Sequence, residues 1–145
     1  MKKIFTEKEI PEIAELIIKH IIKHRNKAGA TLVALSGDLG AGKTTVTKQV
    51  AKLLGIKAPV ISPTFVILKS YGLTKKDWKK FHHIDAYRLE KPKEASRIGW
   101  EALITDPGNV IFLEWPEQLG ELLPKKHILV SLKHKDETKR ELTLK

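Results

Sequence analysis

The stretch Gly37-Asp38-Leu39-Gly40-Ala41-Gly42-Lys43-Thr44 decides the fold of this chain. It satisfies the pattern G-x-x-x-x-G-K-[ST], in which successive backbone N–H groups curl around phosphate oxygens. Lys43 then reaches the outer phosphates, and Thr44 offers a hydroxyl to Mg²⁺. The pattern predicts a solvent-facing phosphate-binding loop rather than a simple glycine turn with a solvated lysine.

The segments on either side of this loop have the secondary structure that the pattern requires. Residues Thr31 to Ser36 form a short apolar run, typical of a buried strand in a parallel sheet. From Lys43 to about Leu54 the apolar residues recur with a helical period, and Gly55 ends the run. Strand, loop and helix together make half of a βαβ unit.

The rest of the chain also alternates between helical and extended patterns. A capping box of Thr6 and Glu9 precedes a helix that we expect to reach about Lys27. Strands are predicted at 65–71, 78–84, 109–113, 127–132 and 141–144, and helical segments at 92–103 and 116–123. The alternation favours an α/β class, a single-domain P-loop NTPase-like fold spanning residues 1–145, with a mostly parallel central sheet, added antiparallel strands and flanking helices.

Composition excludes several classes of protein. The chain has 145 residues, 41% of them hydrophobic and 30% charged, which is typical of a globular domain. Its longest apolar runs fall far short of the roughly 20 residues of a membrane span. The absence of cysteine excludes a disulfide framework, a zinc finger and a cysteine nucleophile. The polar N-terminus contains no signal-peptide core, so we expect a cytoplasmic protein without membrane association.

The formal net charge of +10 is spread along the chain, with one exception. Residues 81–120 carry seven acidic residues against four Lys or Arg. Spread lysine is typical of a solvated surface, and it also suits an acidic partner. We therefore expect the basic surface to dock a protein in preference to nucleic acid.

Two carboxylates in the acidic segment follow predicted strands. A phosphate-binding loop needs a metal-side carboxylate at the end of a neighbouring strand. Glu114 ends the apolar run from Val110, and Asp85 ends the more polar run from Phe81. Either could be the direct Mg²⁺ ligand.

The histidines and tryptophans give weaker signals. His82 and His83 are adjacent, so in a strand they point to opposite faces and cannot readily chelate one metal; we expect one to be packed and the other solvated. Trp115 follows the second candidate carboxylate and is either a core residue or a clamp near the site. Trp78 and Trp100 are predicted to be packing residues.

Four motifs, taken in order, resemble the TsaE family of small bacterial ATPases. The resemblance extends from the first helix to Pro124. The motifs are Gly37-Asp38-Leu39-Gly40-Ala41-Gly42-Lys43-Thr44-Thr45, Ser62-Pro63-Thr64-Phe65, His83-Ile84-Asp85-Ala86-Tyr87-Arg88-Leu89 and Glu114-Trp115-Pro116-Glu117.

The resemblance implies a Mg²⁺-dependent ATPase that acts with the TsaD and TsaB proteins, which transfer threonylcarbamoyl to adenosine 37 of tRNA (t6A modification). It makes Thr44 and Glu114 the expected Mg²⁺ ligands, with Asp85 a catalytic or water-mediated metal carboxylate. Thr64 would lie in a switch-like loop facing the γ-phosphate, with Lys43 on the phosphates. We expect ATP to be bound by Gly37, Asp38, Leu39, Gly40, Ala41, Gly42, Lys43, Thr44 and Thr45.

Two other functions use the same residues differently. A small-molecule kinase would need a lid with several arginines, and the four arginines are scattered; only Arg88 is close in sequence to a candidate site residue. A nucleic-acid module would need aromatic residues among basic ones, and only Tyr71 and Trp78 fit. We expect tRNA to be reached indirectly, through the partner complex.

The base preference follows from a missing motif. Guanine-specific P-loop proteins read the base with an Asn/Thr-Lys-x-Asp segment. The closest string, Asn26-Lys27-Ala28-Gly29, lacks the aspartate and precedes the loop. The sequence therefore predicts ATP rather than GTP.

Overall fold

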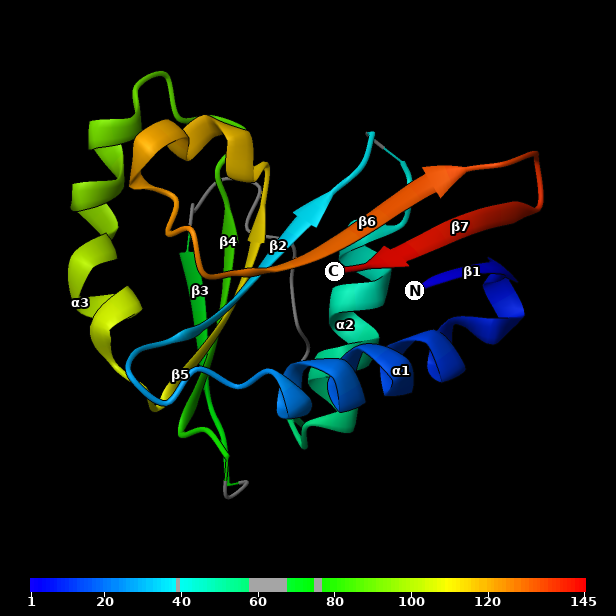
Figure 1. The fold of residues 1–145 in the computed structure, drawn as a ribbon, viewed down its shortest axis with the longest axis horizontal. Coiled ribbons are helices and arrows are strands. Elements are labelled where there is room, and N and C mark those ends of the chain that lie inside the picture. The colour runs from blue at the N-terminus through cyan, green and yellow to red at the C-terminus, as the bar shows by residue number, and fades with distance from the viewer. Residues whose placement is uncertain (39, 58–67, 75–76) are drawn as a thin grey trace.

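The structure, a computed structural model, describes residues 1–38, 40–57, 68–74 and 77–145, and there the chain forms one mixed sheet with helices on both faces (Figure 1). The strands are β1 (Lys2–Thr6), β2 (Thr31–Ser36), β3 (Leu68–Gly72), β4 (Lys80–Asp85), β5 (Asn109–Glu114), β6 (Ile128–His134) and β7 (Lys139–Leu144). The α-helices are α1 (Ile10–Lys23), α2 (Lys43–Leu53) and α3 (Trp100–Thr105), and the 3₁₀ segments are η1 (Glu7–Glu9), η2 (Pro92–Ile98) and η3 (Pro116–Leu122).

The strand order confirms the predicted fold class. In the part of the chain that the structure describes, the order is β1-β7-β6-β2-β5-β4-β3. The four inner strands β6, β2, β5 and β4 are parallel to their inner neighbours. Antiparallel pairing adds β3 at one edge and β7 with β1 at the other.

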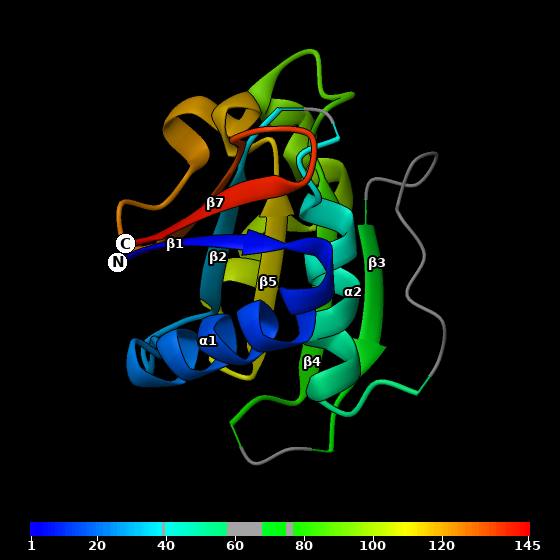
Figure 2. The ribbon, with the colours of Figure 1, turned by 90° about the vertical axis from the view of Figure 1, so that its right-hand side faces the viewer.

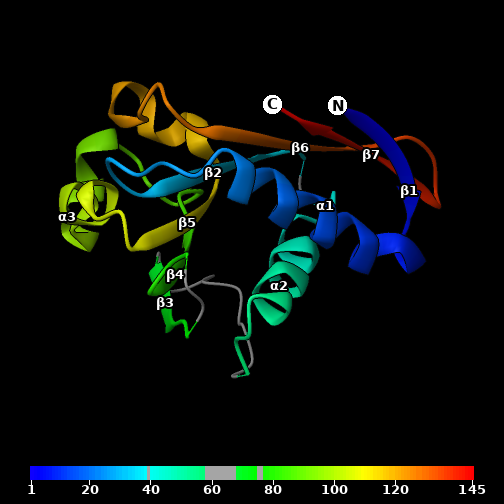
Figure 3. The same cartoon turned by 60° about the horizontal axis from the view of Figure 1, so that its bottom comes forward.

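Two helical layers cover the sheet, which explains why its central strands are apolar throughout. Helices α1 and α2 lie together over one face, and η2, α3 and η3 cover the other (Figures 2 and 3). Every residue of β5 is buried, as parallel strands covered on both sides require. The buried residues of α1 recur with a helical period and form one face: Ile10, Ile13, Ala14, Ile17 and Ile21.

Some boundaries differ from the predicted ones for local reasons. Helix α1 ends at Lys23 because Asn26 closes a turn: its side chain accepts a hydrogen bond from the Ala28 amide and donates one to the Ala30 carbonyl. The predicted helix at 92–103 is divided into η2 and α3 by Gly99, whose φ is +73°. Strand β1 was not predicted, because its hydrogen-bond partners lie in β7, far along the chain.

Residues 58–67 lie outside the described residues, and with them the start of the strand predicted at 65–71; its remainder lies in β3. The strand predicted at 127–132 does more than pair with the last strand. Strand β6 also pairs in parallel with β2, so the chain end is joined to the centre of the sheet.

The topology gathers the carboxyl ends of β2, β5 and β4 along one edge of the sheet. Strand β2 leads directly into the phosphate-binding loop, β5 ends with Glu114 and β4 ends with Asp85. These two carboxylates are opposite each other in the β4–β5 register. Ligand sites in open α/β sheets form outside the carboxyl ends of strands.

Candidate nucleotide site

The glycines of the loop have backbone conformations that other residues rarely adopt. Gly37 has φ of +146°, and a Cβ atom there would lie 2.3 Å from the carbonyl oxygen of Leu132 on β6. Gly42 has φ of +95° and forms the N-cap of α2. The loop therefore passes close beside β6 and turns its backbone into the start of a helix, whose free N–H groups and dipole suit phosphate.

Lys43 is buried, unlike the solvated lysine of a simple glycine turn. Its side chain is 5% exposed, its Nζ donates a 2.6 Å hydrogen bond to the Gly37 carbonyl, and it lies 4.0 Å from the centre of the Trp115 ring. The loop thus surrounds the ammonium group of Lys43. A phosphate that binds Lys43 must replace these contacts with its own oxygens.

Glu114 is a buried carboxylate held by two side chains. Oε2 lies 2.6 Å from Nε2 of His83, and both carboxylate oxygens lie 3.5 Å from the Thr44 hydroxyl. The side chains of His83 and Glu114 are 0% and 5% exposed. Nδ1 of His83 has no hydrogen-bond partner among the described residues, so the imidazole serves Glu114 alone.

Asp85 lies beside this pair at the end of the neighbouring strand. Its Oδ1 accepts a 3.0 Å hydrogen bond from the Tyr87 amide. Burial raises the pKa of Asp85, and the nearby charge of Glu114 raises it further, while the Tyr87 amide opposes the shift. The two carboxylates of the site therefore differ in their surroundings: Glu114 is buried and contacts a histidine, whereas Asp85 is partly exposed.

A cavity of about 420 Å³ joins these groups. It is lined by Gly40, Gly42, Lys43, Thr44, Thr45, Asp85, Tyr87, Arg88, Glu114, Trp115 and Arg140. Cationic, hydroxyl and carboxylate groups therefore converge on one space next to the N-terminus of α2.

Trp115 forms one wall of the cavity. It has φ of +59°, which among the described residues makes it the single non-glycine residue with positive φ. Its ring lies 5.1 Å from that of Tyr87 and covers the Lys43 ammonium. Of the two interpretations left open for Trp115, core residue or clamp, its position favours the clamp.

The structure gathers most of the predicted site residues. Gly40, Gly42, Lys43, Thr44, Thr45, Asp85 and Glu114 line the cavity. Ala41 is 1% exposed and packs in the core, whereas Asp38 and Gly37 line a neighbouring hollow of about 370 Å³. Leu39 and Thr64 lie outside the described residues, so their expected roles stay predictions.

Sequence reasoning did not place His83 at the site. It predicted that one of His82 and His83 is solvated, which is wrong, because both are buried, at 4% and 0% exposed. On opposite faces of β4, His82 contacts Ser70 and Asn109 while His83 contacts the site. The two-residue spacing of His83 and Asp85 was a usable signal, since such residues share a strand face.

Arg140 is the second missed residue. It lies on β7, and its guanidinium would be 3.5 Å from a Cβ atom on Gly42. Sequence reasoning considered Arg88 as the internal arginine of the site, but both arginines line the cavity. Nothing near Arg140 in the sequence marks it, because the β6–β7 hairpin brings it to the loop.

The oxygen atoms of the site fit a hard divalent cation. A threonine hydroxyl and two carboxylates are the ligands that Mg²⁺ prefers, together with substrate phosphates. Among the residues described, no group of three or more His, Cys, Asp or Glu could hold a metal by itself. A cation here would therefore depend on nucleotide oxygens for part of its coordination.

Strand order, loop and cavity together define an α/β protein of the P-loop NTPase type. A solved structure, YdiB of Bacillus subtilis, superposes with a TM-score of 0.70 at 28% identity, covering 99% of this chain and 83% of that one. The family model described as threonylcarbamoyl adenosine biosynthesis protein TsaE matches residues 5–142. The chain belongs to the TsaE family.

Individual relatives agree with this membership. The chain is 34% identical over 146 residues to a tRNA threonylcarbamoyladenosine biosynthesis protein TsaE of Rickettsia typhi, covering 100% of this chain and 94% of the relative. It is 38% identical over 112 residues to the protein of the same name from Bacillus subtilis, covering 77% of this chain and 67% of the relative. Among the described residues, no helix is both long enough and apolar enough to cross a membrane.

Proposed function

We propose that this protein binds and hydrolyses Mg-ATP in support of t6A modification of tRNA in the cytoplasm, working with the TsaD and TsaB proteins. The observation that carries the proposal is the convergence of Lys43, Thr44, Asp85 and Glu114 on one cavity at the N-terminus of α2. Family membership supplies the biological process, because the relatives are named for it.

The residues divide the work by their chemistry. The loop amides and the start of α2 bind the phosphates, and Lys43 exchanges the Gly37 carbonyl for phosphate oxygens. Arg88 and Arg140 place two further positive charges on the same cavity, where they oppose the negative charge of the transferring phosphoryl group. Phosphoryl transfer depends mainly on such positioning and charge stabilisation.

The carboxylates have separate roles. Thr44 and Glu114 would hold Mg²⁺, which neutralises charge on the phosphates when it is bound. Asp85 is the more exposed carboxylate, and it can orient the attacking water or meet the cation through water. His83 fixes the orientation of Glu114 through the 2.6 Å contact.

The intrinsic rate should be low in the absence of TsaD and TsaB. Large accelerations in phosphoryl transfer come from an arginine held on the transition state, often one that a partner supplies or orders. We therefore expect TsaD and TsaB to raise the turnover of this protein.

Calorimetry and turnover assays test the proposal. We expect Mg-ATP to bind more tightly than GTP, and Asp85→Ala and Glu114→Ala each to lose most hydrolysis while Arg97→Ala, an exposed change on η2, does not. If only one of the two carboxylate variants loses ATP hydrolysis, that residue is the essential carboxylate and the division of roles is refuted. Tighter binding of GTP, or unchanged turnover in both variants, would refute the proposal.

A small-molecule kinase is the second candidate, favoured by the presence of two arginines in the cavity. The same assay distinguishes the two reactions by the fate of the γ-phosphate. Release of inorganic phosphate in proportion to ADP supports hydrolysis. Consumption of ATP only when a second small molecule is added supports the kinase.

A further inference from the structure

A second concave site lies at the other end of the parallel strands from the nucleotide cavity. It has a volume of about 330 Å³ and is formed where α1 ends and where β2 and β6 begin. Five of its lining residues are basic or histidine, and we call it the basic hollow: His24, Arg25, Lys126, His127 and Lys145. The six residues of β2 separate it from the phosphate-binding loop, a distance of roughly 20 Å.

The segments that form the basic hollow are rich in basic residues. None of the described side chains that line it is acidic, and the sequence has no acidic residue from Leu16 to Gly37 or from Leu122 to Lys135. Basic residues of these two segments therefore have no acidic neighbour in their own segment. Of the basic residues that line the hollow, only Arg25 has an acidic partner among the described ion pairs, and this partner is Asp77.

His20 is half-buried on α1, one turn before His24. Its pKa is lowered mainly by burial and then by the charges of His24, the N-terminus and Lys23. Arg25 is paired with Asp77 at 3.3 Å, and its guanidinium lies 5.6 Å from the Trp78 ring centre. Arg25 is therefore held at the rim of the hollow.

Two polar groups of the hollow are fixed by hydrogen bonds. Nδ1 of His127 donates to the Pro124 carbonyl at 2.6 Å, which leaves Nε2 of the neutral ring as an acceptor. The Thr31 hydroxyl oxygen accepts hydrogen bonds from the Asn26 amide and the Trp78 indole, so its own hydrogen is left to donate. The ammonium groups of Lys126 and Lys145 only donate hydrogen bonds, so a ligand that accepts them and carries negative charge fits the site.

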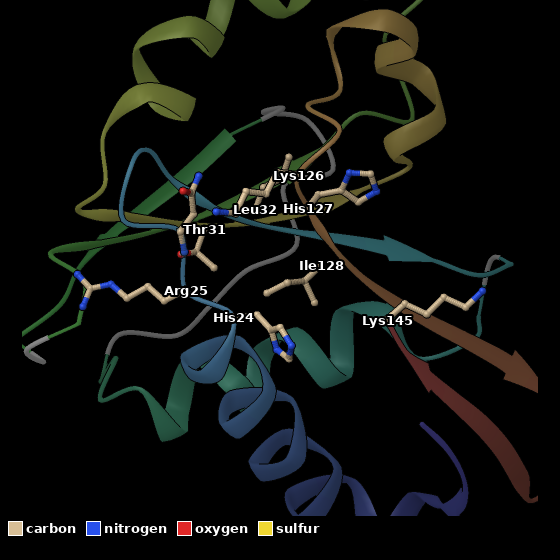
Figure 4. A pocket seen from close by; sticks show the side chains of 9 residues that line it. His24, Arg25, Thr31, Leu32, Lys126, His127, Ile128 and Lys145 are labelled. Carbon is tan, nitrogen blue, oxygen red and sulfur yellow. The ribbon is translucent and has the colours of Figure 1, made fainter.

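The spread of the basic groups distinguishes an extended anion from a small one. Figure 4 shows Lys126 and His127 above Ile128, with Arg25 and Lys145 extending to opposite sides. One carboxylate or phosphate ion could not meet all of these groups, whereas a phosphodiester chain carries a charge at each nucleotide. The apolar lining residues Leu32 and Ile128 are 3% and 6% exposed, so the hollow lacks the exposed apolar core that protein interfaces bury.

We propose that the basic hollow binds the phosphate backbone of RNA. This differs from the sequence-based expectation that tRNA is reached only through partner proteins. Among the described residues, the hollow and the nucleotide cavity have separate linings. The contacts are to phosphates, and binding should therefore be strongly salt-dependent with little sequence preference.

The test compares two charge reversals in the full-length chain, with an unmodified tRNA transcript as the probe. Lys126→Glu changes an exposed residue of the hollow, and Lys93→Glu makes the same change on the exposed surface of η2. Each phosphate contact contributes a slope of about 0.7 to 0.9 in log affinity against log salt. Losing one contact should thus weaken binding roughly five- to eightfold at 0.1 M salt.

We expect wild-type protein and Lys93→Glu to bind tRNA equally, and Lys126→Glu to bind more weakly with a smaller salt slope. Equal weakening by both variants would mean a diffuse charge effect and overturn the proposal, as would absence of tRNA binding at low salt. Tighter binding of a polyglutamate peptide than of tRNA, lost in Lys126→Glu, would overturn it in favour of a protein partner. Mg-ATP affinity, measured on the same samples, reports separately on the proposed ATPase and on folding.

Discussion

Replacing His83 by leucine tests the contact that holds the Glu114 carboxylate. In His83→Leu, Glu114 keeps only the Thr44 hydroxyl at 3.5 Å among its described contacts, and the carboxylate stays 4% exposed. Removing one partner of a buried pair typically costs about 3 to 5 kcal/mol, because the remaining charge is left uncompensated. For a protein of this size the loss corresponds to a fall in Tm of roughly 6 to 20 °C.

A double-mutant cycle measured by urea unfolding separates this contact from general packing. Glu114→Met should also destabilise, because it leaves both His83 ring nitrogens without partners among the described residues. The double variant His83→Leu/Glu114→Met replaces the pair by apolar groups, which is often close to neutral. We expect it to lose at least about 2 kcal/mol less than the sum of the single variants.

The matched control uses the neighbouring histidine. His82 points to the other face of β4, where it contacts Asn109 at 3.0 Å and Ser70 at 2.7 Å. His82→Leu combined with Glu114→Met should therefore be additive. If the His83 cycle is additive as well, the 2.6 Å contact contributes no coupling and the reasoning about Glu114 is refuted.

Three further predictions concern the loop and the pH dependence of stability. Lys43→Ala should abolish ATP hydrolysis and lower the free energy of unfolding by at most about 1.5 to 3 kcal/mol, since it removes one charged hydrogen bond. The control Lys48→Ala, at an exposed position of α2, should change neither hydrolysis nor stability. ATP turnover in Lys43→Ala would exclude this lysine from the reaction. Gly37→Ala should destabilise more than Lys43→Ala in thermal melts, because its Cβ atom would meet the Leu132 carbonyl at 2.3 Å; a wild-type Tm would contradict this. Burial lowers the pKa of His82 below its ordinary value of 6.5, so the unfolded chain binds a proton on this histidine at a higher pH than the folded chain does. The free energy of unfolding should therefore decrease as the pH falls through about 6.5. In His82→Asn the decrease should be smaller, and a decrease equal to that of the wild type would mean that His82 does not contribute.

Local patterns were sufficient for the centre of the fold. The apolar run Thr31 to Ser36 and the helical period after Lys43 are properties of short segments, and both elements were predicted within a residue or two. The loop between them could be predicted because its glycines, lysine and threonine must be contiguous. The positions of Asp85 and Glu114 could be predicted for the same reason, since each residue ends its own strand.

Long-range pairing determined what the sequence could not show. Strand β1 exists because β7 supplies its hydrogen bonds, and Arg140 reaches the loop because β6 and β7 form a hairpin beside it. The burial of both His82 and His83 has the same origin: a strand with a polar sequence lies inside the sheet. Partners on β3 and β5 bond both ring nitrogens of His82 and one ring nitrogen of His83. No short window of sequence contains these partners.

The close approach of Gly37 to β6 changes how this position should be read in distant relatives. Because the neighbouring carbonyl of Leu132 excludes a side chain, glycine is required at Gly37 by strand packing alone. A relative that has lost catalysis would still be selected to keep it. Retention of this glycine is therefore a weak indicator of nucleotide binding, whereas retention of Lys43, whose ammonium is buried within the loop, is a much stronger one.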